Sequence, residues 1–163
     1  MSSDSLVTLI SNDGDEVKAT LQAVQQSITL KSMLEVLDDE QTTGLPIPLP
    51  EIKGETLRNV MRWCEHHRGE TDNFVPDLSG RPRSEWMPAW DVDFFTFEKD
   101  MLFKVANAAN YLEIPRLLHY TAATIAFNLK GKSTEEMREY LHIKNDLTPE
   151  QEEKIRKDNA WVW

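Results

Sequence analysis

The segment 116–130 constrains the fold most, because its helical pattern is apolar on more than one side. One stripe follows the spacing i, i+4, i+7, i+8 and i+11 and consists of Leu118, Ala122, Ile125, Ala126 and Leu129. A second side carries Leu117, Thr121, Thr124 and Phe127. A surface helix usually has a single apolar face. The segment is therefore predicted either to lie at the centre of its own domain or to bury one side against another protein.

The tail after this segment predicts two short helices that cannot form a domain alone. Each begins with a capping box, Ser133–Glu136 for the first and Thr148–Gln151 for the second. The apolar residues of 131–163 are few, and segments below about 40 residues rarely bury enough surface to fold unaided. The two helices are therefore expected to lie against something else.

The chain ends with two large aromatic residues, Trp161 and Trp163. Chain termini fray unless they are held, and tryptophan is enriched at the hot spots of protein interfaces. We therefore predict that the tail and helix 116–130 build an apolar groove for a protein partner. The alternative is that both indoles fold back onto the domain.

The N-terminal part predicts a small sheet with helices. Residues 5–19 alternate around the turn Asn12–Asp15 and predict a β-hairpin. Leu30, Met33, Leu34 and Leu37 form one stripe of a helix that ends at Asp38–Glu40. The alternating prolines of Leu45–Pro50 exclude a helix and a central strand, which leaves an extended edge segment.

Further helices are predicted over about 55–67, 99–112 and 116–130, with a short aromatic helix within 90–97. Between the first and the aromatic helix, residues 69–89 contain prolines and glycines without any period, which predicts a mobile loop. Its apolar residues are expected to be too sparse for a core element; they are Phe74, Val75, Trp86 and Met87.

Charge and composition exclude several classes of partner. The 163 residues contain 28 acidic and 18 basic side chains, for a net charge of −10. Such a chain repels phosphate backbones and anionic lipids, so neither nucleic acid nor a membrane is an expected partner. No apolar run approaches the ~20 residues of a membrane span, and the N-terminus does not resemble a secretory signal. The single cysteine, Cys64, excludes an internal disulfide and fits a reducing compartment.

Cys64, His66 and His67 are the only cluster that invites a metal or nucleophile hypothesis. A zinc site needs four convergent ligands, and on a helix only Cys64 and His67 share a face. Cys64 also belongs to an apolar stripe, where a free cysteine packs as a small hydrophobe. There is no glycine-rich phosphate loop and no paired acid and base. We therefore predict no enzyme activity, no metal and no cofactor.

Several segments, in order along the chain, resemble the Skp adaptor family of SCF (Skp–cullin–F-box) ubiquitin ligases. They are Pro46–Pro50, Trp63–His67, Ala109–Ile114, Lys130–Glu136, Ile143–Glu150 and Ile155–Trp161. The resemblance implies an α+β fold: a BTB/POZ-type domain over 1–128, with a small sheet and packed helices, followed by two C-terminal helices over 129–163. It also implies a non-catalytic adaptor of the cytoplasm and nucleus. That adaptor links the N-terminal region of a cullin, and indirectly its RING subunit, to F-box substrate receptors.

The resemblance also assigns residues to two faces. The cullin-binding face should centre on Asn110 and Tyr111, with core packing of Tyr111 as the alternative. The F-box-binding face should use Leu102, Phe103, Leu118, Ala122, Ile125, Ala126, Leu129, Leu141, Ile143, Asn145, Asn159 and Trp161. The small Ala122 would let a partner helix approach closely, so Ala122→Glu should block F-box binding and leave the fold intact.

The sequence departs from the family pattern at residue 134, at its C-terminal end and in one loop. Thr134 stands where a proline is usual, Val162 where a cysteine is usual, and the chain lacks the customary acidic tail after Trp163. The loop segment Phe74–Arg83 also lacks the usual lysine-rich insert. These departures leave open which F-box proteins the chain accepts.

A second hypothesis is a cullin-independent assembly protein. The same apolar groove, if it stays unpaired, would favour F-box-like partners or a homodimer when no F-box is bound. Charge substitution at Asn110 and Tyr111 separates the two hypotheses, because it should abolish the adaptor role and spare the assembly role.

Overall fold

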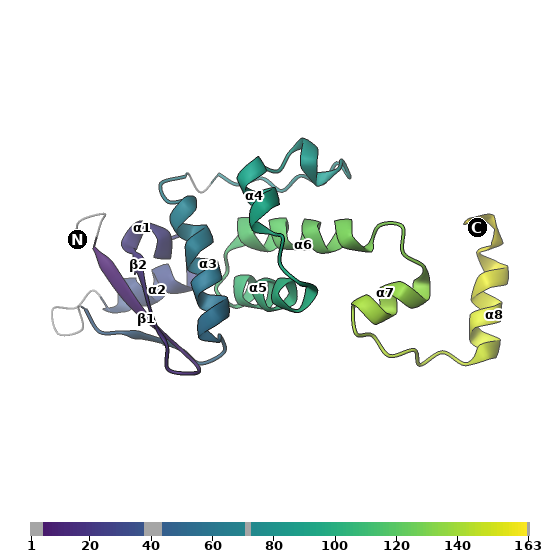
Figure 1. Cartoon of the computed structure of the whole chain (residues 1–163), viewed down its shortest axis with the longest axis horizontal. Helices are drawn as coiled ribbons and strands as arrows, with labels where there is room; N and C mark the ends of the chain where they lie inside the picture. Colours follow the sequence, from purple (N-terminus) through teal and green to yellow (C-terminus); the bar gives the residue numbers. More distant parts are fainter. Residues whose placement is uncertain (1–4, 38–43, 71–72, 163) are drawn as a thin grey trace. The chain divides into compact units, whose positions relative to one another are not determined.

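The computed structural model describes residues 5–37, 44–70 and 73–162, and the chain divides into two compact units, Met1–Asn128 and Leu129–Trp163 (Figure 1). Two predictions lie outside the described residues: the helix end at Asp38–Glu40 and the surroundings of Trp163. In the described parts of the chain, no helix combines the length and the apolar character needed to cross a bilayer.

Unit 1 begins with a three-stranded sheet in the order β2-β1-β3. Strands β1 (Leu6–Ser11) and β2 (Glu16–Thr20) form an antiparallel hairpin, and β3 (Ile47–Leu49) pairs parallel to β1. Gly14 has a φ of +85° in the hairpin turn, a conformation that glycine adopts without strain. The predicted hairpin and the proline-rich edge segment are both confirmed.

The helices of unit 1 agree with the predicted positions to within a few residues; only the short α1 and η1 were not predicted. The helices are α1 (Leu21–Val24), α2 (Ile28–Leu37), α3 (Gly54–His66), η1 (Arg83–Glu85), α4 (Ala89–Phe94), α5 (Lys99–Tyr111) and α6 (Pro115–Leu129), whose last residue already belongs to unit 2. Helix α3 lies beside the sheet and packs against α5 (Figure 1).

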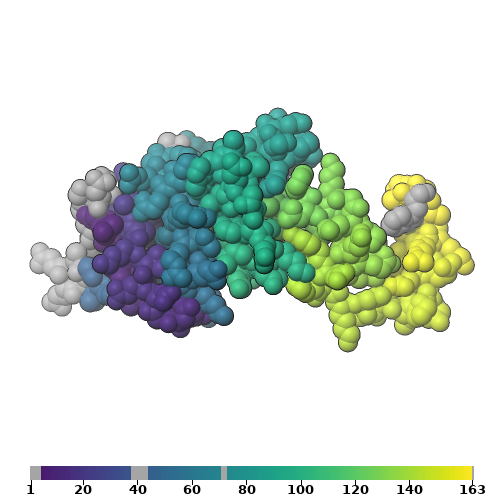
Figure 2. Space-filling view, viewed as in Figure 1, coloured from purple at the N-terminus to yellow at the C-terminus, as the bar shows by residue number. Residues whose placement is uncertain are grey.

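The core of unit 1 is built around α3. The predicted stripe of Leu57, Val60, Met61 and Cys64 is buried, and so is Trp63. Helix α5 adds Leu102 and Val105, and the sheet adds Leu9 and Leu49. In the space-filling view the purple strands and the blue to teal helices after them form one continuous body (Figure 2). Burial of these side chains is the main source of stability in unit 1.

One prediction is wrong for the segment between α3 and α4, which was expected to contribute nothing to the core. Its apolar residues are not too sparse for the core: Met87 is 4% exposed, and Phe74 and Trp86 pack against the core. The rings of Phe74 and Trp86 lie with centroids 5.6 and 5.3 Å from the His119 ring of α6. The two aromatic residues come from opposite ends of the segment and meet on one side of α6. Sequence spacing alone does not reveal that meeting.

Unit 2 contains α7 (Thr134–Tyr140), α8 (Pro149–Asp158) and η2 (Ala160–Val162). Both predicted capping boxes form. In the first box, the Ser133 hydroxyl accepts a hydrogen bond from the Glu136 backbone at 3.2 Å, and the Glu136 carboxylate accepts one from the Ser133 backbone at 2.7 Å. The bond from the Ser133 backbone, and next the Ser133 side chain, lower the pKa of the Glu136 carboxyl. Local capping therefore defines these helices, since none of the described residues 129–162 is buried.

Candidate protein-binding surfaces

Helix α6 is covered by its own unit on one side only. Leu117, Tyr120, Thr121 and Thr124 are buried. The two threonines tolerate burial because their hydroxyls donate to the Leu117 and Tyr120 carbonyls at 2.7 and 2.9 Å. Burial also raises the pKa of Tyr120. The helix therefore does not lie at the centre of the domain, which was one of the two possibilities for its double apolar pattern.

Next to this buried side lies a partly covered apolar strip, the α6 strip, formed by Leu118, Ala122, Ile125 and Ala126. Leu118 and Ile125 are half-buried and pack against the core of unit 1, whereas Ala122 and Ala126 are exposed. The exposed alanines project little from the helix, so a partner helix could approach its backbone closely. Phe127 was predicted on the same side as Leu117, Thr121 and Thr124 but is not buried with them. It is 53% exposed, and the Arg83 guanidinium lies 4.6 Å from its ring centroid.

Unit 2 carries a separate apolar surface of its own. Leu147, Ile155, Asn159, Ala160 and Val162 help to line a cavity of about 660 Å³. Ile155 is 48% and Val162 58% exposed, so neither side chain is buried by its own unit. The charged walls of the cavity come from Glu135, Arg138, Glu152 and Arg156.

The remaining predicted F-box residues of unit 2 differ in exposure. Trp161 is 84% and Ile143 56% exposed, whereas Leu129 and Leu141 are half-buried. Unit 2 therefore leaves the Trp161 indole exposed, and folding back onto the domain stays an alternative prediction.

Two predicted asparagines of unit 2 fix local backbone. Asn145 donates to the Glu152 carboxylate at 2.8 Å and accepts from the Leu147 backbone at 3.1 Å. Asn159 donates to the Ile155 carbonyl at 2.8 Å. Both side chains are exposed, so they shape the unit 2 surface and also belong to it.

Asn110 and Tyr111 lie at the C-terminal end of α5, whereas the α6 strip lies on α6. Asn110 is exposed and Tyr111 is 37% exposed. Core packing, the alternative for Tyr111, is therefore not what the structure shows. An aromatic body with a polar tip is a common anchor at protein interfaces.

The assignment of Leu102 to the F-box-binding face is wrong. Its side chain is 0% exposed in the core of unit 1, so it is not on a surface, and only the adjacent Phe103 remains half-buried. The spacing could have revealed this. Leu102, Val105 and Ala109 recur at i, i+3 and i+7, and all three are buried.

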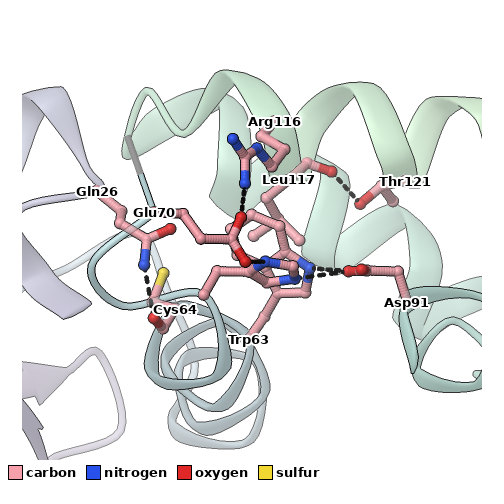
Figure 3. Close-up of polar contacts among 9 residues, drawn as sticks. Gln26, Trp63, Cys64, Glu70, Asp91, Arg116, Leu117 and Thr121 are labelled. Atoms are coloured by element: carbon pink, nitrogen blue, oxygen red, sulfur yellow. Dashed lines mark hydrogen bonds and ion pairs between the residues drawn. The ribbon is translucent and has the colours of Figure 1, made fainter. Parts of the chain in front are cut away.

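His67 belongs to a polar cluster with Trp63, Asp91, Glu70 and Arg116, whereas His66 is exposed (Figure 3). Asp91 of α4 is 0% exposed, and one of its oxygens accepts from the Trp63 indole at 2.7 Å and pairs with His67 Nε2 at 2.9 Å. The other ring nitrogen of His67 pairs with Glu70 at 2.8 Å, and Glu70 pairs with Arg116. The cluster therefore connects α3, α4 and α6. Sequence reasoning missed Asp91, because no local pattern links it to Trp63.

The cluster shows none of the features of a nucleophile or metal site. Cys64 is fully buried, and burial raises the pKa of its thiol, which disfavours the reactive thiolate. His66 stacks on Trp90 with ring centroids 3.6 Å apart. Across the described ranges, no three His, Cys, Asp or Glu side chains gather as metal ligands would.

The sequence matches two family models and several curated relatives. Residues 5–69 match the model of the Skp1 family tetramerisation domain, and residues 115–162 match that of the Skp1 family dimerisation domain. A protein of Arthroderma benhamiae named E3 ubiquitin ligase complex SCF subunit sconC is 42% identical over 157 residues, which cover 96% of this chain and 94% of the relative. A protein of the same name from Arthroderma otae is 40% identical over 159 residues, covering 97% and 94%. Since both matches span nearly the whole chain, the chain belongs to the Skp1 family.

Proposed function

We propose that this chain is the adaptor subunit of an SCF-type ubiquitin ligase, which links a cullin scaffold to F-box substrate receptors. The observation that carries the proposal is the α6 strip, formed by side chains that unit 1 leaves exposed or half-buried. The names of the relatives, both SCF subunits, support the same role. The role is non-catalytic and needs no metal or cofactor, and its place of action is the cytoplasm and nucleus.

The F-box receptor binds the apolar side chains that each unit leaves exposed or half-buried. In unit 1 these are the residues of the α6 strip, together with the half-buried Phe103 of α5. In unit 2 they include Ile143, Ile155 and Trp161, each about half exposed or more. Burying such side chains contributes roughly 25 cal/mol per Å² of apolar area. Binding therefore supplies the burial that unit 2 does not obtain from its own residues.

The cullin binds a different surface, centred on Asn110 and Tyr111. Because these residues are separate from the α6 strip, one chain can hold a cullin and an F-box protein together. That simultaneous binding is what an adaptor requires, and the RING subunit then joins through the cullin.

The test is a pull-down of the tagged chain from a eukaryotic extract, with partners identified by mass spectrometry. Ala122→Glu places a charge in the α6 strip and should weaken F-box binding by about a hundredfold, because a buried unpaired charge is costly. Cullin binding should persist through Tyr111. A matched control is Ala89→Glu, an exposed alanine at the first turn of α4, which should leave both partners bound. Full F-box recovery with Ala122→Glu would contradict the proposal.

The α6 strip also favours a second candidate function, a cullin-independent assembly protein. In that case the chain binds F-box-like partners or forms a homodimer through the same strip. Tyr111→Lys distinguishes the two functions. If the wild-type chain recovers both partners and Tyr111→Lys loses only the cullin, the adaptor function is supported. If the wild-type chain itself recovers F-box proteins without any cullin, the assembly role is supported.

A further inference from the structure

We propose that the cullin-binding surface extends from Tyr111 onto the exposed side of α2, where Ile28, Ser32 and Val36 form a second contact strip. The proposal rests on the adaptor function above and adds a contact element to it. It would make α2 a determinant of how tightly the scaffold binds.

Hydrogen bonds join the start of α2 to the end of α5. The Ile28 backbone N–H donates to the Glu113 carbonyl at 3.1 Å, and the Ser27 hydroxyl donates to the Leu112 carbonyl. The Thr29 hydroxyl lies 3.3 Å from both the Tyr111 carbonyl and the Glu113 carboxylate. Each residue from 111 to 113 therefore accepts a hydrogen bond from Ser27, just before α2, or from one of the first two residues of α2. The Tyr111 anchor and the start of α2 form one rigid surface.

The turn after Tyr111 depends on these bonds. Glu113 has a φ of +50°, a left-handed conformation that is unfavourable for a residue with a side chain. Such a conformation persists where its surroundings hold it, and here Ile28 and Thr29 do so. The position of Tyr111 is consequently fixed from α2 before any partner arrives, which lowers the ordering cost of binding.

The outer side of α2 carries aliphatic side chains that unit 1 leaves uncovered. Ile28 is 51% and Val36 81% exposed, and the small Ser32 between them is exposed as well. The three residues are spaced at i, i+4 and i+8, which places them on one side of the helix. Leu30 on the inner side is 0% exposed. An exposed aliphatic row with a small central residue suits the apolar face of a partner helix.

The cullin is the partner that fits the α2 strip, because the hydrogen bonds described above join this strip to Tyr111. The F-box-binding strip lies on α6, a different helix. Lys31 and Glu35 are exposed on α2 and Glu113 lies beside its start, so the aliphatic row has a charged rim of both signs. Apolar centres with polar rims are typical of specific protein interfaces.

The test measures the affinity of the full chain for a purified N-terminal cullin fragment. Ile28→Glu and Val36→Lys should each weaken binding by about tenfold or more, as removal of an interface contact does. Both should still fold, because an acid suits the first turn of α2 and a base suits its last turn. The matched control is Val75→Lys: Val75 is also 81% exposed but lies outside α2, and its variant should bind within about twofold of wild type.

Binding of an F-box protein by the same variants provides a second readout, and it should not change. Loss of cullin binding with Tyr111→Lys but not with Ile28→Glu or Val36→Lys would overturn the extended surface and leave the adaptor function standing. No cullin binding by the wild-type chain would overturn both. A changed oligomeric state of the α2 variants in sedimentation, with unchanged cullin affinity, would instead make the strip a contact between copies of this chain.

Discussion

The two units of the chain differ in what holds them together. In unit 1, Trp63 is 0% exposed and donates a hydrogen bond to a buried carboxylate. In unit 2, Trp161 is 84% exposed, and none of the described residues 129–162 is buried. Unit 1 is therefore stabilised by a core, whereas the helices of unit 2 are defined by their capping boxes. The comparison indicates that the apolar side chains of unit 2 are available to a partner.

The largest expected difference comes from truncating one tryptophan in each unit. Trp63→Ala should destabilise unit 1 by about 3–5 kcal/mol, because it leaves a cavity and removes a hydrogen-bond donor from buried Asp91. Trp161→Ala should change the free energy of unfolding by no more than about 0.5 kcal/mol and should weaken F-box binding. Urea denaturation followed by circular dichroism measures the first effect, and a binding titration measures the second.

A comparable loss of stability in both variants would contradict the comparison between the units. So would undiminished F-box binding by Trp161→Ala, since the exposed indole would then have no role in recognition.

The buried polar cluster provides a second, smaller test within unit 1. His67→Phe keeps a ring in the core but removes both carboxylate contacts, so Asp91 retains only its bond from Trp63. Leaving a buried polar group short of a hydrogen bond costs about 1–3 kcal/mol. The control is His66→Phe, where the exposed ring can still stack on Trp90. Equal stability of the two variants in denaturant melts would show that the cluster does not hold α4 in place.

The smallest expected effect concerns the caps of unit 2. Ser133→Ala removes the hydroxyl that caps α7 and should destabilise that helix by about 1 kcal/mol. Hydrogen exchange should speed up at the amides of α7 while the exchange of α3 stays unchanged. Ser84→Ala, at an exposed serine of η1, is the control and should alter neither helix. Faster exchange in α3 as well as in α7 would mean that the units are not stabilised separately.

The sequence predicted those features that depend on neighbours along the chain. The hairpin, the edge segment at Pro48 and both capping boxes are local patterns, and each is present in the structure. The features it missed depend on distant residues. Trp63 and Asp91 meet across 28 positions, and the packing of Phe74 and Trp86 on α6 requires the loop path to be known. Such pairings follow from tertiary packing, which no short-range period encodes.

The candidate surfaces were predicted unevenly for the same reason. The double apolar pattern of α6 predicted a helix with one apolar side that its own domain does not bury. The structure leaves Ala122 and Ala126 on that side exposed. Leu102 was assigned to the same face by resemblance, although its own spacing with Val105 marks it as core. The strip on α2 was not predicted, because the position of Ile28 next to Tyr111 depends on the turn at Glu113.

The central claim is that one chain binds a cullin and an F-box protein at the same time through separate residues. The most direct measurement is the affinity for the N-terminal cullin fragment with and without a saturating F-box protein, followed by the mass of the complex. The account predicts an affinity that changes by less than about threefold and a ternary complex containing one copy of each protein. Mutually exclusive binding, with the F-box protein displacing the cullin fragment, would contradict it.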